Sequence, residues 1–214
     1  HGLVRTREGK KMSKSDPKSC IDPLDMIQKY GADALRLSMV IGNTPGNDVK
    51  LYEEKIAGYR NFVNKIWNAA RYALMQADEA KASSDELVAH SSADKWILTR
   101  TQELVKEVTN DIESFNFSDA GSKIYDFTWN EFCAWYMEIS KGEHKNLPVL
   151  NYVLSTIIKL LHPFVPYVTE VLWSHLNNKE LLLKQEWPKA NKNYIFTEEA
   201  HGINVLIEVI TAIR

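Results

Sequence analysis

The sequence predicts a mainly α-helical protein: a helical bundle preceded by a loop and a short helical segment. Apolar residues recur at three- and four-residue steps over long stretches, capping residues stand before several of those stretches, and strand-like alternation is minor. Of the 214 residues 44% are hydrophobic and 25% are charged, which is ordinary for a globular protein with a sizeable core. We expect three parts, which comprise residues 1–50, a helical bundle over 51–190, and a C-terminal connection over 191–214.

The two short helices of the first part are predicted on either side of Gly31. Asp22 followed by Pro23 is a favourable helix start, because the carboxylate can accept hydrogen bonds from free backbone N–H groups and proline suits the first turn. Gly31 ends that helix, and a second helix is expected from Ala32 to about Ile41. The run GNTPGND, residues 42–48, then predicts a loop.

The bundle is predicted from long helices over residues 53–76, 93–114, 119–140 and from 148 onwards. Ser118 is the expected N-cap of the third, and Pro163 and Pro166 interrupt the fourth before a further helix to about residue 176. Residues 181–188 suggest a short strand, and a last helix is expected from about residue 203. The inward stripe of the first long helix comprises Ile56, Tyr59, Val63, Ile66, Trp67, Ala70 and Leu74.

Several classes of protein are disfavoured by the sequence. No apolar run approaches the roughly 18 residues that cross a bilayer, and the first residues lack the apolar stretch of a signal peptide. Cys20 and Cys133 lie far apart without CxxC spacing, so neither a zinc site nor a disulfide framework is indicated. We therefore predict a cytoplasmic protein without a protein-bound metal and without a membrane partner.

The charge of the chain is unevenly distributed. Residues 1–75 hold 13 Lys and Arg against 8 Asp and Glu, whereas residues 76–214 hold 13 against 20. A positive front half favours a phosphate-bearing partner. The acidic remainder is not the surface of a general nucleic-acid binder, so any RNA contact there must be local.

The motif KMSKS, residues 11–15, resembles the second signature of class I aminoacyl-tRNA synthetases. It is followed by IDPLDMIQKYGADALRL, which resembles the end of the catalytic domain in the valine, isoleucine and leucine branch, where the DALR run is residues 33–36. WNEFCAWYMEISK and LLHPFVPYVTEVLW resemble the helical anticodon-binding domain of that branch. The resemblance covers nearly the whole chain and implies that residues 1–50 contain the end of the catalytic domain with a stem-contact segment.

One stretch bears on the amino acid that the parent enzyme would use. The run GNTPGNDVKLYEEKIAGYRNFVNKIWNAARYAL is similar to the valine-specific members of the branch. The resemblance implies an enzyme that joins valine to ATP and then transfers it to tRNA(Val). An isoleucine-specific parent is the alternative.

The resemblance also implies roles for the KMSKS residues. Negative charge builds on the ATP phosphates during adenylation, and flexible ammonium groups stabilise it. Lys14 and Lys11 are thus the expected catalytic residues, and Lys11, Ser13, Lys14 and Ser15 are expected to bind the phosphates of ATP, which carries Mg2+ as substrate of the full enzyme. Met12 is expected to anchor the loop on an apolar surface. Asp16-Pro17 replaces the glycine-containing run usual in the family, which affects how the loop would close.

The partner signature of this class, His-x-Gly-His, is absent from the sequence. We therefore expect a fragment that binds tRNA but does not catalyse alone. Arg60, Asn64, Asn68 and Arg71, on the polar face of the first long helix, are the predicted RNA contacts, with a solvated face as the alternative. A free-standing tRNA-binding module and a helical scaffold are the rival functions, and DNA is not an expected partner. The aromatic residues around Trp135 are expected to pack in the core.

Overall fold

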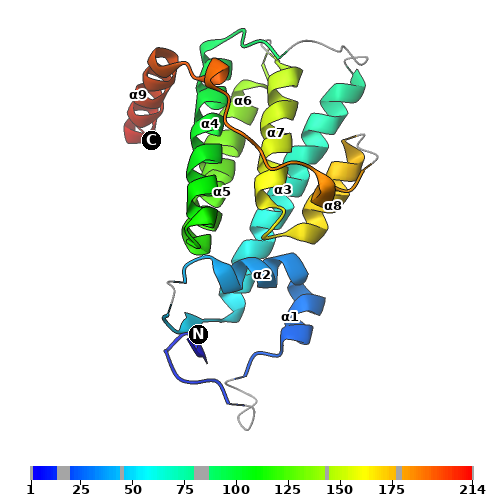
Figure 1. Ribbon diagram of the computed structural model, residues 1–214, viewed down its shortest axis with the longest axis vertical. Helices are drawn as coiled ribbons and strands as arrows, with labels where there is room; N and C mark the ends of the chain where they lie inside the picture. The colour runs from blue at the N-terminus through cyan, green and yellow to red at the C-terminus, as the bar shows by residue number, and fades with distance from the viewer. Residues whose placement is uncertain are drawn as a thin grey trace.

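The computed structural model describes residues 2–13, 20–43, 46–79, 87–142, 145–176 and 180–213, with side chains omitted for 77–79. A small lower segment sits beneath a tall bundle of helices, and helix α3 runs from one into the other (Figure 1). The mainly α-helical architecture predicted from the sequence is confirmed. The expected boundaries at residues 50 and 190 stay predictions.

The lower segment contains two short helices and a minimal sheet. Strand β1, Val4–Arg5, pairs in parallel with β2, Val49–Lys50, and helices α1, Pro23–Tyr30, and α2, Ala32–Val40, lie between them in sequence. Asp22 caps α1 by accepting from the Leu24 N–H at 2.7 Å. Gly31 separates the helices with a φ of 88°, a conformation that favours glycine. Both predicted helices are thereby confirmed.

The bundle is formed by the long helices and packs around one continuous core. Its elements are α3, Glu53–Glu79; α4, Ser92–Glu113; α5, Phe117–Asp126; a π-helical stretch, Phe127–Tyr136; α6, Met137–Ile139; α7, Leu147–Leu161; and α8, Pro166–His175. Two single 3-10 turns follow, Leu182–Lys184 and Lys192–Tyr194, and α9, Thr197–Ile213, packs against α4. The largest fully buried side chains are Trp96, Tyr136, Phe62 and Phe132, all of them in the bundle.

A buried polar cluster fixes the upper end of the bundle. The Asp94 carboxylate is 2% exposed and accepts hydrogen bonds from the Tyr136 hydroxyl at 2.8 Å and the Asn146 amide at 2.9 Å. It also accepts from the backbone N–H of Ser91, whose own hydroxyl accepts from the Asp94 N–H, which is a capping box for α4. Buried polar groups are expensive when unpaired, so this cluster specifies how three helices meet. The expectation that the aromatic residues around Trp135 pack in the core is confirmed, since Tyr136 belongs to the core cluster and Trp129 and Trp135 pack against it.

Three local predictions were wrong. Ser118 lies inside α5, and its hydroxyl accepts from the Gly42 and Asn43 N–H groups, so Asn116 occupies the N-cap position instead. Residues 181–188 contain a 3-10 turn rather than a strand, since only Leu182 is buried there and no neighbouring strand is available for pairing among the described residues. The last helix begins at Thr197, not near Ile203.

The lower segment is attached to the bundle through the two charged residues of the DALR run. Asp33, at the start of α2, accepts from the backbone N–H groups of Tyr167 and Val168 at 3.3 and 2.7 Å, which caps α8. Arg36 donates to the carbonyl oxygens of Phe164 and Pro163, both at 3.1 Å. These contacts join residues about 130 positions apart in the chain and hold α8 beside α3.

Candidate RNA-binding face

Helix α3 is buried along one side and open along the other. Ile56, Phe62, Ile66 and Ala70 are at most 1% exposed and face the core. The four predicted RNA contacts, Arg60, Asn64, Asn68 and Arg71, are all exposed. Because residues three and four apart lie on the same face of a helix, the structure brings them together as one row of polar side chains.

The polar side chains of this row are mostly without intramolecular partners. Arg60 donates a hydrogen bond to the carbonyl oxygen of Lys29 in α1. The side chains of Asn64, Asn68 and Arg71 make no hydrogen bond or ion pair with any part of the chain that the structure describes. Their donors are therefore available to an external ligand.

The middle of α3, residues 55–76, carries positive charge only. Between Lys55 and Gln76 the helix carries Lys55, Arg60, Lys65 and Arg71 and no acidic residue. Lys65 lies over the ring of Trp129 at 5.4 Å, and burial lowers the pKa of Lys55 without any carboxylate opposing the shift. Within the described ranges none of these four cations forms an ion pair. A helix with this charge pattern favours a polyanion.

Trp67 is the one residue of the predicted apolar stripe that is exposed. Its side chain is 40% exposed, and its indole meets the ring of His175 in α8 edge-on, with centroids 6.3 Å apart and an interplanar angle of 87°. The sequence contained a signal for this position. Arg60, Asn64, Trp67 and Arg71 follow one another at steps of four, three and four, which is the spacing of a single helix face.

The KMSKS segment is only partly within the described residues. Lys11 is exposed, and its backbone bridges to Arg5. Met12 is half-buried and packs with the small cluster of Ala34, Leu51 and Ile56, as predicted for a loop anchor. Ser13 is exposed, and Lys14, Ser15 and the Asp16-Pro17 pair lie outside the described residues.

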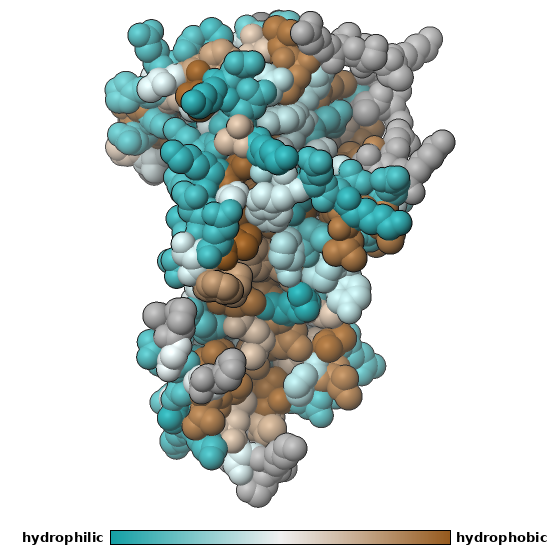
Figure 2. All heavy atoms as spheres, viewed as in Figure 1, coloured by the Kyte–Doolittle hydropathy of each residue, from teal (hydrophilic) through white to brown (hydrophobic). Residues whose placement is uncertain are grey.

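An apolar cleft of about 970 Å³ opens where the lower segment meets the bundle. Met39, Val49, Phe117, Phe164 and Trp187 are among its lining residues, together with Glu113. On the face seen in Figure 2, apolar surface gathers around this junction, whereas hydrophilic surface dominates over α4 and α9. Among the described residues, no Lys or Arg lines the cleft, so these residues offer no cationic side chain to a phosphate group.

Neither a membrane-spanning helix nor a cluster of metal-binding side chains occurs among the described residues. Among the residues that the structure describes, no helix has the length and hydropathy needed to cross a bilayer. Across the same ranges, His, Cys, Asp and Glu side chains do not gather in threes around a point where a metal ion could bind.

Comparison with known proteins identifies the fold of the bundle. The family described as "Anticodon-binding domain of tRNA ligase" matches residues 94–214, which is more than half of the chain. The chain belongs to this family. Residues 1–52 match a second family, described as "tRNA synthetases class I (I, L, M and V)". The anticodon-binding match begins in α4 and the synthetase match ends just before α3.

Curated relatives match over the full length of the chain. It is 42% identical over 225 residues to the valine–tRNA ligase of Bacillus thuringiensis, and 44% identical over 225 residues to that of Clostridium tetani. Each alignment covers 100% of this chain but only 25% and 26% of those proteins, so the chain spans about a quarter of their length.

A solved structure supports the same fold. A LeuRS–tRNA–LeuAMS ternary complex from Agrobacterium radiobacter K84 superimposes with a TM-score of 0.76 at 24% identity. The match covers 91% of this chain and 24% of that one. At this identity the likeness concerns the fold alone.

Proposed function

We propose that this chain is the tRNA-binding part of a valine–tRNA ligase, and that the exposed face of α3 contacts the RNA. The observation that carries the proposal is the row of partner-free Asn and Arg side chains on a helix without acidic residues over 55–76. RNA loops are bound through phosphate contacts by cations and through polar contacts to bases. The identity of the curated relatives supports valine and tRNA(Val) as the substrates.

The KMSKS loop has a separate role in this proposal. In the complete enzyme Lys14 and Lys11 stabilise the charge that builds on ATP phosphates during adenylation, and Ser13 and Ser15 add hydroxyl donors. ATP enters with Mg2+ as a substrate. The cytoplasmic location remains a prediction that rests on the family.

The test of RNA binding compares two transcripts. The 214-residue chain is titrated with a valine tRNA transcript and with the same transcript carrying a replaced anticodon, at about 50 and about 200 mM salt, where phosphate contacts differ strongly in strength. We expect tighter binding to the valine anticodon and a marked loss of affinity at the higher salt. Absence of salt-sensitive binding to either transcript refutes the proposed function.

The catalytic assignment needs the complete enzyme. Lys14→Ala should slow ATP–pyrophosphate exchange far more than it weakens tRNA binding, because the lysine acts on the phosphates and not on the RNA. Lys18→Ala, a change of another lysine nearby in sequence, is the control. An exchange rate for Lys14→Ala equal to that of the unchanged enzyme contradicts the assignment.

A further inference from the structure

An exposed tryptophan lies within the polar row of α3. Trp67 is 40% exposed, while its sequence neighbour Ile66 is 1% exposed and belongs to the core. Arg71 is one turn further along the helix, Asn64 is one turn back, and Asn68 is the next residue. Positions three and four apart are neighbours on a helix surface, so the indole is flanked by amide and guanidinium groups.

Among the described residues, the Trp67 indole has one aromatic ring contact outside its own helix. The ring of His175 lies 6.3 Å from it, centroid to centroid, at an interplanar angle of 87°, so these two rings are not stacked face to face. The indole N–H has no hydrogen-bond partner among the described residues, although buried tryptophans usually find one. The bundle supplies examples: the indole N–H of Trp96 donates to Asn204 at 2.8 Å, and that of Trp187 donates to Thr109 at 2.8 Å.

A single exposed apolar side chain needs no explanation by itself. The surroundings of Trp67 are what distinguish it, since no acidic residue occurs on α3 from 55 to 76 and Arg71 has no ion-pair partner in the described part of the chain. A flat ring next to uncompensated positive charge is complementary to a nucleotide, which combines an aromatic base with a phosphate. An apolar protein partner would leave the guanidinium and both amides unpaired, which is costly.

We propose that Trp67 is a stacking platform for one unpaired base of the bound RNA, that His175 holds the indole in place edge-on, and that Arg71 contacts the adjoining phosphate. The inference rests on the proposed function and adds to it the chemical class of the nucleotide, a base in a single-stranded loop. Bases in a duplex present only their edges, whereas loop bases can be splayed onto aromatic side chains.

The test uses the whole 214-residue chain and a hairpin RNA with the anticodon stem and loop of a valine tRNA. Stacking on an aromatic residue accounts for roughly 5- to 100-fold in affinity per base. We expect Trp67→Ala to weaken binding within this range and Trp67→Phe, which keeps a ring, to weaken it much less. Phe115→Ala, a change of an aromatic side chain that is 74% exposed after α4, is the matched control and should leave affinity unchanged.

A second set of hairpins locates the base. Each carries one abasic nucleotide in the loop, and each is bound to the unchanged chain and to Trp67→Ala. At the position that stacks on Trp67 the two proteins should bind equally well, because the base that the indole needs is gone; at other positions the difference should persist. A difference that persists at every loop position overturns the proposal.

Failure of the inference can be told apart from failure of the proposed function. If the unchanged chain shows no salt-sensitive binding to the hairpin, the proposed function fails. If it binds, and Arg71→Gln weakens binding while Trp67→Ala does not, only the stacking role is overturned. The thermal unfolding midpoint of Trp67→Ala is measured alongside. If Trp67→Ala is unfolded at the assay temperature, its affinity is not used, and Trp67→Phe is compared with the unchanged chain on the abasic hairpins instead.

Discussion

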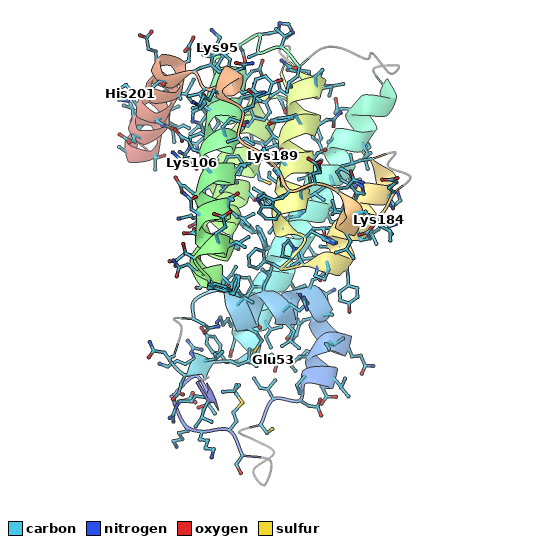
Figure 3. The ribbon with its side chains drawn as sticks, viewed as in Figure 1. Glu53, Lys95, Lys106, Lys184, Lys189 and His201 are labelled. Atoms are coloured by element: carbon cyan, nitrogen blue, oxygen red, sulfur yellow. The ribbon has the colours of Figure 1, made fainter. Side chains whose placement is uncertain are left out.

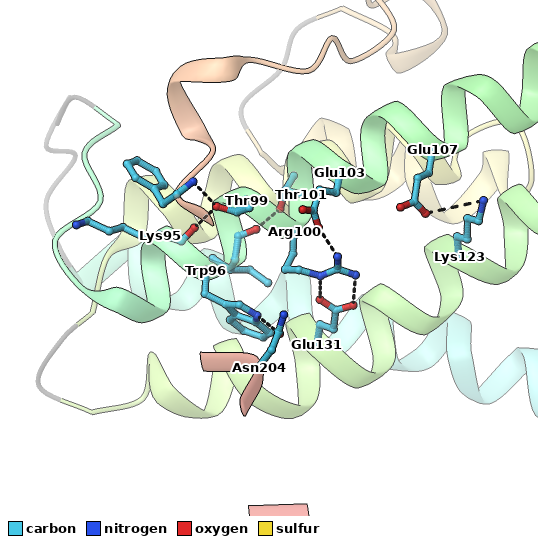
Figure 4. Close-up of polar contacts among 12 residues, drawn as sticks. Lys95, Trp96, Thr99, Arg100, Thr101, Glu103, Glu107, Lys123, Glu131 and Asn204 are labelled. Atoms are coloured by element: carbon cyan, nitrogen blue, oxygen red, sulfur yellow. Dashed lines mark hydrogen bonds and ion pairs between the residues drawn. The ribbon is translucent and has the colours of Figure 1, made fainter. Parts of the chain in front are cut away.

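Helices α3 and α4 are of similar length and use their charges differently. Over residues 55–76, α3 carries four cations and no acid, and none of these cations is ion-paired within the described ranges. In α4, by contrast, Arg100 pairs with Glu131 and Glu103 (Figure 4). Lys95 of α4 reaches Glu199 of α9 at 2.7 Å. Figure 3 shows Lys95 at the top of α4, away from Glu53 at the start of α3. Arg100 and Lys95 of α4 thus connect elements of the fold, whereas Arg71 of α3 has no ion-pair partner among the described residues.

The largest expected effect concerns α4. Asp94→Ala should lower the free energy of unfolding by about 3–5 kcal/mol, because it removes the capping box and leaves the buried Tyr136 hydroxyl unpaired, at about 1–3 kcal/mol for such a group. The Asn146 amide also loses one of its two hydrogen bonds and keeps the one that it donates to the Val88 carbonyl oxygen. Urea unfolding followed by circular dichroism measures this change. Glu113→Ala, at an exposed position on the same helix, is the control; an equal loss there contradicts the special role of the buried cluster.

A smaller effect is expected from α3. Arg71→Gln should weaken RNA binding about 5- to 10-fold and reduce the slope of log affinity against log salt by about 1, because one phosphate contact is lost. Stability should change by less than about 0.5 kcal/mol, as is usual at exposed positions. Filter binding at several salt concentrations gives the slope. A lowered stability with an unchanged slope would mean that Arg71 belongs to the fold.

The matched change in α4 should behave in the opposite way. Arg100 donates to both carboxylate oxygens of Glu131, at 2.7 and 3.0 Å, and this arrangement raises the pKa of its guanidinium. Arg100→Gln should cost about 1 kcal/mol of stability, since the pair is only partly buried. RNA affinity and its salt slope should not change. An affinity loss as large as that of Arg71→Gln would refute the division between the two helices.

The smallest effect concerns pH. The hydrogen bond from Lys95 holds the pKa of Glu199 below its usual value of 4.5. A lowered folded-state pKa means that this contribution to stability is present above the unfolded pKa and is lost as pH falls through the folded value. Between about pH 5 and pH 3, therefore, Glu199→Gln should lose stability less steeply on acidification than the unchanged chain. Urea midpoints at several pH values test this, and identical slopes would contradict it.

The sequence predicted the helices well because their signals are local. Asp22, Pro23 and Gly31 act within a few residues, so α1 and α2 follow from capping and backbone preference alone. Ser118 was misplaced because a hydroxyl that could cap a helix can equally bind a distant loop, and here it receives the N–H groups of Gly42 and Asn43. A capping preference read from neighbouring residues cannot predict whether the hydroxyl binds its own helix or a loop about 75 residues away.

In the candidate RNA-binding face, too, the residues with local signals were predicted and the one that depends on distant contacts was not. Arg60, Asn64, Asn68 and Arg71 were identified from helical spacing, because polarity and period are properties of the sequence. Trp67 was assigned to the core, because its residue type outweighed its position in the same row. The exposure of the indole and its contact with His175 depend on where α8 packs. Asp33 and Arg36 of α2 contact the start of α8 and the residues just before it, and these contacts are not evident from the sequence.

The sequence by itself determined the helical class, the positions of the helices in the lower segment, and a row of polar residues on α3, since these depend on residues within one or two turns. The tertiary structure decided which charges are paired and which aromatic residue is exposed. Those properties depend on groups up to about 130 residues apart, such as Asp33 and Val168, and their energies exist only once the helices are packed.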